Sequence, residues 1–289
     1  MAETLEGLKC PVCAAAAYFF DAVDFNKSCE EAHGKFLPLS GERIDYVRCC
    51  ACDFCFAPGM GAWTQEQFAS KVYNDDYAAL DPEYLEVRPQ ANAKEFIRVF
   101  GQQVAAIRHL DYGGGDGKLS ALLCAAGFNS SDYDPFTTKD ICLEKIGQFN
   151  FITAYEVFEH VSDVRKLMAD LDRLLKSEGI IIFSTLLSDG YLPANRRLTW
   201  WYASPRNGHI SLFSEKSLTV LAQSRGFNFK SFNENIHIFW KKAPAWASIL
   251  SLAPSHTIDA SGDRNKLCAC NSGKKYKHCH GVLVQSSPT

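Results

Sequence analysis

The sequence lacks segments that would lie in or cross a membrane. It has no apolar run of the ~18 residues that a membrane-spanning helix requires, and its first residues, Met1 to Gly7, are acidic rather than apolar. A secretory leader needs an apolar stretch of about 7 to 15 residues near the start. We therefore expect no membrane span and a cytoplasmic location.

The sequence also lacks a strong excess of charge. Its formal net charge is −3 over 289 residues, which gives no electrostatic reason to expect a nucleic-acid partner. Hydrophobic residues make up 47% and charged residues 22% of the chain, as in an ordinary globular protein of one or two domains. The charge is uneven, because residues 261–289 hold five basic residues against one acidic residue. This basic tail is either a surface for a protein partner or a solvated end.

Cysteine, in contrast, is abundant, with twelve in the chain. A cytoplasmic compartment keeps thiols reduced, so metal binding explains them better than disulfides. Two Cys-x-x-Cys pairs lie near the start, one at Cys10 and Cys13 and the other at Cys49 and Cys52. Four thiolates at this spacing are typical of a closed, tetrahedral structural zinc site. Free thiols are the alternative, and Cys55 could replace one of the four ligands.

Three more cysteines lie near the end of the chain, where residues 268–280 read Cys-Ala-Cys-Asn-Ser-Gly-Lys-Lys-Tyr-Lys-His-Cys-His. This segment resembles the SEC-C motif at the end of the bacterial preprotein translocase ATPase. The resemblance implies a second structural zinc ion, held by Cys268, Cys270, Cys279 and His280, and a surface that contacts a protein partner. A module this short usually needs a metal ion to fold.

Between the cysteine-rich ends, strand-like and helix-like segments alternate. The expected strands are residues 44–48, 106–111, 131–133, 149–155, 179–184, 227–232 and 235–240, and the expected helices are 65–73, 89–100, 118–126, 163–176 and 215–225. This alternation predicts an α/β fold with a doubly wound sheet. We divide the chain into a zinc-binding domain (1–60), a helical segment (61–105), the α/β domain (106–240), a linker (241–265) and the C-terminal zinc motif (266–282).

A glycine-rich turn follows the first strand of the α/β domain. Gly113, Gly115 and Gly117 alternate after Asp111, so the chain can turn sharply and approach a ligand closely at a helix N-terminus. The dinucleotide fingerprint would need a glycine where Lys118 stands. The spacing instead resembles motif I of class I S-adenosylmethionine-dependent methyltransferases. This resemblance implies a Rossmann-like fold flanked by the zinc modules, with the turn lining the methionine part of the cofactor.

Further residues extend the expected cofactor site. Asp134, near the end of the next strand, is placed to accept the two ribose hydroxyls, with Asp132 as the second candidate and a plain Asp-Pro turn as the alternative. Tyr155 is the last residue of the expected 149–155 strand and lies at the ligand-binding edge. The resemblance also implies that Tyr77 and Arg88, from the segment before motif I, meet the carboxylate of the cofactor.

Residues 151–161 look like strand 4 of the family followed by its Glu-His segment. If this segment is helical, Glu156, Glu159 and His160 share one face, and they could bind a divalent ion such as Mg²⁺ that polarises a substrate hydroxyl. The same pattern serves this purpose in ubiquinone-pathway O-methyltransferases and small-RNA 2′-O-methyltransferases, and the latter add a later histidine, here His209. The alternative is that the histidine only braces a loop. Without a metal ion, His160, His209 or Glu156 remains a candidate catalytic base.

Three functions remain open at this point. The first is methyl transfer to an oxygen or carbon of a small molecule or glycan, beneath an insertion at residues 186–211 that would cover the pocket. The second is RNA modification, which the acidic body of the chain opposes. The third is a non-catalytic protein that binds the cofactor and recruits partners through its zinc modules, which the intact glycine turn and Asp134 oppose.

Overall fold

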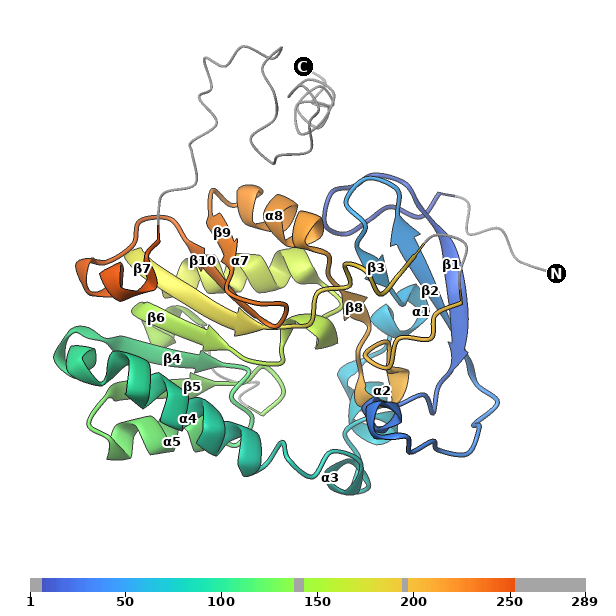
Figure 1. Cartoon of the computed structure of the whole chain (residues 1–289), viewed down its shortest axis with the longest axis horizontal. Helices are drawn as coiled ribbons and strands as arrows, with labels where there is room; N and C mark the ends of the chain where they lie inside the picture. The colour runs from blue at the N-terminus through green and yellow to red at the C-terminus, as the bar shows by residue number, and fades with distance from the viewer. Residues whose placement is uncertain (1–6, 138–142, 194–196, 253–289) are drawn as a thin grey trace, which may run out of the picture. The chain divides into compact units, whose positions relative to one another are not determined.

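The structure, a computed structural model, describes residues 7–137, 143–193 and 197–252 of the chain. A six-stranded sheet forms its centre, in the order β5-β4-β6-β7-β10-β9 (Figure 1). Its strands are β4 (Arg108–Tyr112), β5 (Asn129–Tyr133), β6 (Phe149–Ala154), β7 (Leu175–Ser184), β9 (Asn228–Ser231) and β10 (Ile236–Trp240). Strands β5, β4, β6 and β7 are parallel, and β10 returns antiparallel between β7 and β9. The predicted α/β sheet and its closing hairpin are confirmed.

Helices cover both faces of this sheet. In Figure 1, α4 (Val87–Phe100) and α5 (Lys118–Ala125) lie on one face, and α7 (Val164–Leu174) and α8 (Glu215–Gln223) lie on the other. Helix α7 begins where the Asp163 carboxylate accepts a hydrogen bond from the Lys166 N–H, at 2.8 Å. Its apolar face is buried against the sheet through Leu167, Leu171 and Leu174, as the spacing predicts.

A second sheet forms beside the first, in the order β1-β2-β3-β8 (Figure 1). It consists of β1 (Ala17–Asp24), β2 (Arg43–Cys49), β3 (Cys55–Phe56) and β8 (Ser211–Leu212). Strand β8 belongs to the segment that we expected to form a lid over the pocket. It pairs with β3 instead, so the 186–211 insertion completes the N-terminal sheet.

Short helices connect these parts. They are α1 (Pro58–Gly61), α2 (Gln65–Lys71), α3 (Tyr77–Leu80), α6 (Leu143–Ile146) and the 3-10 turns η1 (Cys29–His33), η2 (Gly101–Ala106), η3 (Phe158–His160), η4 (Pro205–Asn207) and η5 (Ala245–Leu250). Helix α2 begins with a capping box, in which Thr64 and Gln67 each accept a backbone hydrogen bond from the other.

The described residues up to Ile249 belong to one compact unit, which contains both the cysteine-rich segment and the α/β domain. Part of the expected linker packs on this unit. The Trp246 ring stacks on Phe151 with 5.6 Å between centroids, which holds η5 against the central sheet. The expected zinc motif at residues 266–282 lies outside the described residues.

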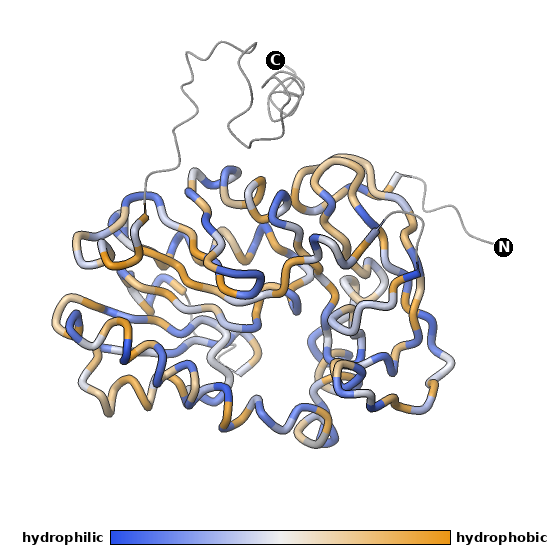
Figure 2. Tube along the Cα trace, in the orientation of Figure 1, coloured by the Kyte–Doolittle hydropathy of each residue, from blue (hydrophilic) through white to orange (hydrophobic). Residues whose placement is uncertain are grey.

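Apolar residues concentrate in the central strands, as the trace coloured by hydropathy shows (Figure 2). Strand β7 is buried along Ile180, Ile181, Ile182 and Phe183, because helices cover it on both sides. Among the described residues, no helix has the length and apolar character that crossing a membrane requires.

Candidate functional site

The glycine turn lies at the carboxyl end of β4, where parallel sheets bind ligands. Gly113 has a left-handed φ of 78°, and a Cβ there would lie 2.4 Å from Cγ2 of Val157. Gly117 is the N-cap of α5 and has a left-handed φ of 77°. The turn therefore requires glycine, and because glycine has no side chain, Gly117 does not cover the N-terminus of α5.

A chain of buried hydrogen bonds supports the turn from below. Asp111 is 5% exposed, and its carboxyl accepts a hydrogen bond of 2.7 Å from the Thr153 hydroxyl. The same hydroxyl lies 2.9 Å from Nε2 of His109, which continues the chain across β4 and β6. Burial raises the pKa of Asp111 to about 7. Asp111 is thus placed to hold the turn, while the backbone of the turn faces the ligand edge.

Asp134 lies at the end of β5, beside the turn. Its carboxylate accepts hydrogen bonds from three backbone N–H groups, those of Gly115 at 3.1 Å, Phe136 at 2.7 Å and Thr137 at 3.2 Å. These bonds fix the carboxylate against the glycine turn, where a ribose would lie. Asp132, the second candidate, is exposed, and its carboxylate lies 3.1 Å from the Cβ position of Gly117.

The residues expected to meet the cofactor carboxylate lie across the turn on α3 and α4. Arg88 donates to Glu156 at 2.9 Å and to Asp81 at 2.5 Å, so two carboxylates already hold its guanidinium. Tyr77 is buried, and its ring packs edge-on against Tyr73 and Tyr84. Tyr155 is half-buried after β6, and burial raises the pKa of its hydroxyl. These side chains lie near the carboxyl ends of the strands. The guanidinium of Arg88, however, is already bound by Asp81 and Glu156.

The expected alignment of Glu156 with Glu159 and His160 does not form. Glu156 has a left-handed φ of 54°, and only Phe158–His160 form a helical turn, which is a 3-10 turn. As a result the Glu156 carboxylate points to Arg88, and its backbone N–H donates to the Ser184 hydroxyl at 2.8 Å. The expectation fails because it assumed an α-helix directly after β6, where the chain turns instead.

Glu159, His160 and His209 do come together. Each offers one ligand atom, and these atoms lie within 4.8 Å of one another. Glu159 is 1% exposed, and its Oε1 accepts a hydrogen bond of 2.6 Å from Tyr202. Its other oxygen, Oε2, is buried without a hydrogen-bond partner in the part of the chain that the structure describes. Such an oxygen is costly unless a cation or donor meets it.

Both histidines of this cluster turn one nitrogen toward the protein. Nδ1 of His209 lies 2.8 Å from the Tyr202 carbonyl, and Nδ1 of His160 lies 3.2 Å from the Gly208 carbonyl. An Nδ1–H that donates to a carbonyl leaves Nε2 as the acceptor, which is the usual support for a metal-binding imidazole. The Tyr73 hydroxyl also lies 3.1 Å from Nδ1 of His160. We call Glu159, His160 and His209 the Glu-His-His cluster.

Burial determines the charges of the Glu-His-His cluster. It raises the pKa of Glu159 to about 8 and lowers that of His160 to about 4, and it lowers the pKa of His209 as well. At neutral pH the empty cluster therefore holds a protonated carboxyl and two neutral imidazoles. Neutral imidazole is the form that binds a metal ion.

Aromatic contacts join the Glu-His-His cluster to the expected cofactor edge. The Tyr73 ring packs against His160 on one side and against Phe136 on the other, with centroids 6.2 and 5.9 Å apart. Phe136 follows Asp134 closely in the chain. Tyr202 lies in the expected 186–211 insertion, and the structure brings its hydroxyl to Glu159. Tyr46 was not expected near the cluster, because it lies 163 positions before His209 in the chain.

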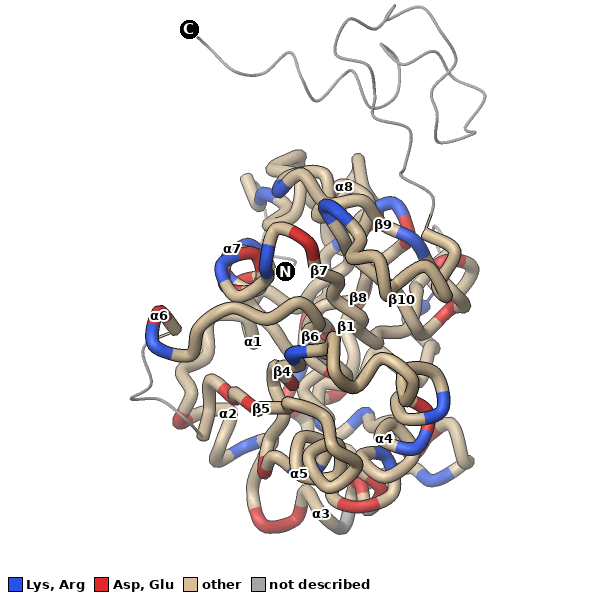
Figure 3. The backbone as a smooth tube through the Cα atoms, turned by 90° about the vertical axis from the view of Figure 1, so that its left-hand side faces the viewer, with Lys and Arg blue, Asp and Glu red and all other residues tan. Residues whose placement is uncertain are grey.

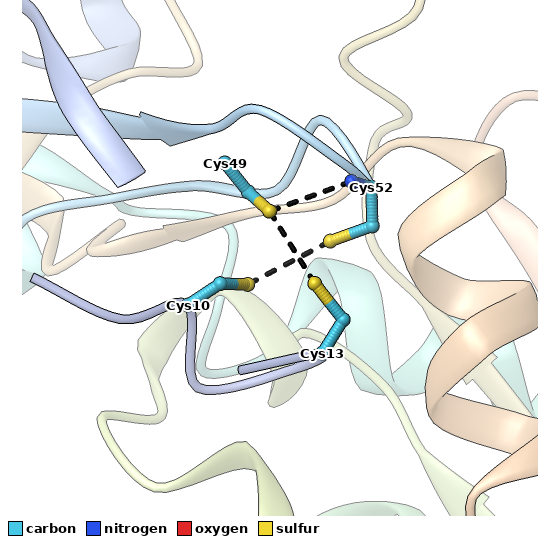
Figure 4. Close-up of side chains that lie close together, drawn as sticks. All are labelled: Cys10, Cys13, Cys49 and Cys52. Carbon is cyan, nitrogen blue, oxygen red and sulfur yellow. Dashed lines mark hydrogen bonds between the residues drawn. The ribbon is translucent and has the colours of Figure 1, made fainter. Parts of the chain in front are cut away.

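The four N-terminal cysteines form a separate centre (Figure 4). Cys10 and Cys52 bring their sulfur atoms within 3.6 Å, and Cys13 and Cys49 bring theirs within 3.4 Å. A tetrahedral zinc ion with Zn–S bonds of about 2.3 Å separates its sulfurs by about 3.8 Å. The backbone N–H groups of Ala51 and Cys52 also point at the Cys49 sulfur. The four side chains fit a structural zinc ion, and Cys55 is not part of the group.

Comparisons with known proteins agree with this geometry. The family described as a methyltransferase domain matches residues 84–231, and the SEC-C motif matches residues 264–281. The SecA protein translocase subunit of Orientia tsutsugamushi (strain Boryong) is 37% identical over 76 residues, which are 26% of this chain and 7% of that protein. The ubiquinone biosynthesis O-methyltransferase of Colwellia psychrerythraea is 36% identical over 69 residues, or 24% of this chain and 27% of that protein. This chain thus spans less than a third of either relative.

Solved structures include distant likenesses. The 1,6-didemethyltoxoflavin-N1-methyltransferase of Burkholderia thailandensis, solved with S-adenosylhomocysteine, is 13% identical, with 71% of this chain and 96% of that chain covered and a TM-score of 0.44. The magnesium protoporphyrin IX methyltransferase of Synechocystis PCC 6803, also with S-adenosylhomocysteine, is 14% identical, with 61% and 95% covered and a TM-score of 0.40.

Proposed function

This chain belongs to the methyltransferase domain family, and we propose that it transfers a methyl group from S-adenosylmethionine to an oxygen or carbon of a small molecule or glycan. The observation that carries the proposal is the glycine turn at the end of β4, with Asp134 fixed beside it by three N–H groups. This arrangement leaves a backbone surface and a carboxylate at the edge where a parallel sheet binds its ligand.

Within this proposal, each part of the turn has one role. Gly113, Gly115 and Gly117 allow close approach of the methionine part, and Asp134 accepts the ribose hydroxyls. Asp111, fixed to β6 by Thr153, lies against Gly114 of the turn. Arg88 would meet the cofactor carboxylate only by giving up or sharing its pairing with Asp81 and Glu156, and Tyr77 and Tyr155 would wall the pocket.

For the acceptor side we propose the Glu-His-His cluster. A divalent ion bound there would lower the pKa of an acceptor hydroxyl, which favours transfer to oxygen. Two observations support this proposal: Oε2 of Glu159 has no hydrogen-bond partner among the described residues, and a backbone carbonyl lies beside Nδ1 of each histidine. Glu156 pairs with Arg88 and is outside the ligand set. Two imidazoles with one carboxylate suit Mn²⁺ or Zn²⁺ better than the Mg²⁺ that the sequence pattern led us to expect.

The chemistry asks little of the protein beyond alignment. The acceptor oxygen attacks the methyl carbon as the bond to the sulfonium sulfur breaks, which yields S-adenosylhomocysteine. The acceptor must also lose its proton. In the absence of an ion, Nε2 of His160 or His209 would accept this proton directly, because burial keeps both imidazoles neutral at pH 7.

A small acceptor is favoured over RNA by the distribution of charge. Lys and Arg residues are interspersed with Asp and Glu residues along the backbone drawn in Figure 3. A nucleic-acid site usually gathers basic residues on one face. The basic residues after 260 lie outside the described structure, and we propose a protein partner for them because that segment matches the SEC-C motif. Cys268, Cys270, Cys279 and His280 would hold its zinc ion.

The test is cofactor binding by calorimetry with the zinc-loaded full chain. S-adenosylmethionine should bind with a one-to-one stoichiometry, and S-adenosylhomocysteine should compete. A second titration with Mn²⁺ tests the Glu-His-His cluster, and Glu159→Ala and His209→Ala should each abolish that binding while S-adenosylmethionine still binds. If the zinc-loaded protein does not bind S-adenosylmethionine, the proposed function is wrong.

A further inference from the structure

The backbone carbonyl of His209 is held by the cysteine-rich sheet. The Tyr46 hydroxyl donates a hydrogen bond of 2.6 Å to the His209 carbonyl, and both residues are buried. Tyr46 lies on β2, a strand that ends at Cys49 of the four-cysteine centre. A donor in the middle of the N-terminal sheet therefore fixes the backbone of a residue in the acceptor site.

Neighbouring contacts make the same connection. On one side, β8 pairs with β3, and the Ala57 N–H donates to the Ile210 carbonyl at 2.9 Å. The Ser214 hydroxyl, just beyond β8, donates to the Cys52 carbonyl at 2.7 Å. On the other side, the Ile210 N–H donates to the Glu159 carbonyl at 2.9 Å. Residues 209–214 thus lie between the four-cysteine centre and the loop that carries Glu159.

We propose that the four-cysteine centre positions His209 for the acceptor site, and that Tyr46 is the positioning residue. This inference rests on the proposed function of the Glu-His-His cluster. A zinc ion bound by Cys10, Cys13, Cys49 and Cys52 would fix the end of β2 and the start of β3. Strand β2 carries Tyr46, and β3 pairs with β8. The zinc ion therefore determines where the His209 imidazole lies without touching the substrate.

The alternative is that the N-terminal sheet only packs against the 186–211 insertion. In that case, every contact between the two would matter equally. Asp21 provides the comparison, since its carboxylate accepts hydrogen bonds from the Leu198 N–H at 2.6 Å and from Arg197 at 2.9 Å. It joins β1 to the same insertion, but at a point away from His209. The positioning proposal requires that losing the Tyr46 hydroxyl disturbs the cluster, whereas losing the Asp21 contact does not.

The experiment measures amide hydrogen exchange by mass spectrometry on the zinc-loaded full chain. Tyr46→Phe should raise exchange in peptides covering residues 204–214 about 10-fold, because it removes one buried hydrogen bond. Exchange in β6 should not change. Cys13→Ser, which removes a thiolate from the centre, should have at least the same effect. The matched controls are Asp21→Ala and Cys50→Ser, the latter an exposed thiol beside the centre but outside it.

A binding measurement separates positioning from stability. Tyr46→Phe should weaken Mn²⁺ binding to the zinc-loaded protein about 10-fold and leave the Kd of S-adenosylmethionine unchanged. Unchanged exchange at residues 204–214 in Tyr46→Phe, or an equal increase in Asp21→Ala, would overturn the proposal. If the unmodified protein binds neither S-adenosylmethionine nor Mn²⁺, the proposed function fails, and the exchange comparison still decides whether Tyr46 and the cysteine centre hold His209. Where Cys13→Ser does not fold, exchange after a chelator has removed zinc from the unmodified protein takes its place, and unchanged exchange at residues 204–214 would overturn the role of the centre.

Discussion

Tyr202 donates a hydrogen bond of 2.6 Å to Oε1 of Glu159, and this bond fixes one oxygen of the carboxyl in the Glu-His-His cluster. The second oxygen of the same carboxyl is buried without a hydrogen-bond partner among the described residues. Burial raises the pKa of Glu159 to about 8. The hydrogen bond therefore fixes the carboxyl in one orientation, and the cost of burying its unpaired oxygen would be offset by a bound cation.

This cost makes the stability of the metal-free protein depend on pH. The folded protein keeps the Glu159 proton up to about pH 8, whereas the unfolded chain releases it near pH 4.5, so this group lowers stability progressively as pH rises between these values. Glu159→Gln removes the ionisable group and places an N–H₂ beside the acceptor nitrogens of the histidines. We expect it to raise the free energy of unfolding at pH 8 by about 1–3 kcal/mol, measured by chemical denaturation.

Mn²⁺ provides the control for this prediction. It should raise the melting temperature of the unmodified protein and have no effect on Glu159→Gln, because the amide is a poor metal ligand in place of the carboxylate. A destabilised Glu159→Gln protein at pH 8 would show that the second oxygen of the carboxyl is satisfied in solution, contrary to the structure.

Gly113→Ala should abolish cofactor binding. The new methyl group would lie 2.4 Å from Val157, and the left-handed φ of 78° is strained for alanine. We expect the Kd of S-adenosylmethionine to rise at least about 100-fold, because the turn must move to relieve this contact. Gly101→Ala is the matched control, since that glycine has an ordinary φ of −58° and no atom within 4 Å of its Cβ position. Calorimetry should show equal binding for the control and the unmodified protein.

The sequence predicted the regular parts of this fold well and the site only in part. Every α/β element that it predicted is present, because apolar spacing and glycine turns are local signals. The pairing of β3 with β8 was not predictable, since it joins residues more than 150 positions apart. The orientation of Glu156 was not predicted, for another reason. Its backbone is left-handed because the chain turns directly after β6, and the spacing of Glu156, Glu159 and His160 indicates a helix there instead.

Two aspartates compete for the ribose role, and matched substitutions separate them. Asp134→Asn should weaken S-adenosylmethionine binding about 10-fold, because a neutral amide accepts the ribose hydroxyls less strongly than a carboxylate and places an N–H₂ against the N–H of Gly115. Asp132→Asn, an exposed position two residues earlier, should change the Kd less than about twofold. If the two variants exchange these effects in calorimetry, Asp132 rather than Asp134 binds the ribose.

A side chain on α7 contacts the cysteine loop of the four-cysteine centre from the α/β domain. Arg165 donates to the Pro11 carbonyl at 2.7 Å and to the Val12 carbonyl at 3.3 Å, and these two residues connect Cys10 to Cys13. Arg165→Ala should therefore loosen this loop and speed zinc release to a chelator about 10-fold, because two charge-assisted hydrogen bonds are lost. Arg173→Ala is the control, since that arginine lies at the other end of α7 and pairs with the exposed Glu144 of α6. Equal rates of zinc release from the two variants would show that Arg165 does not hold the cysteine loop in solution.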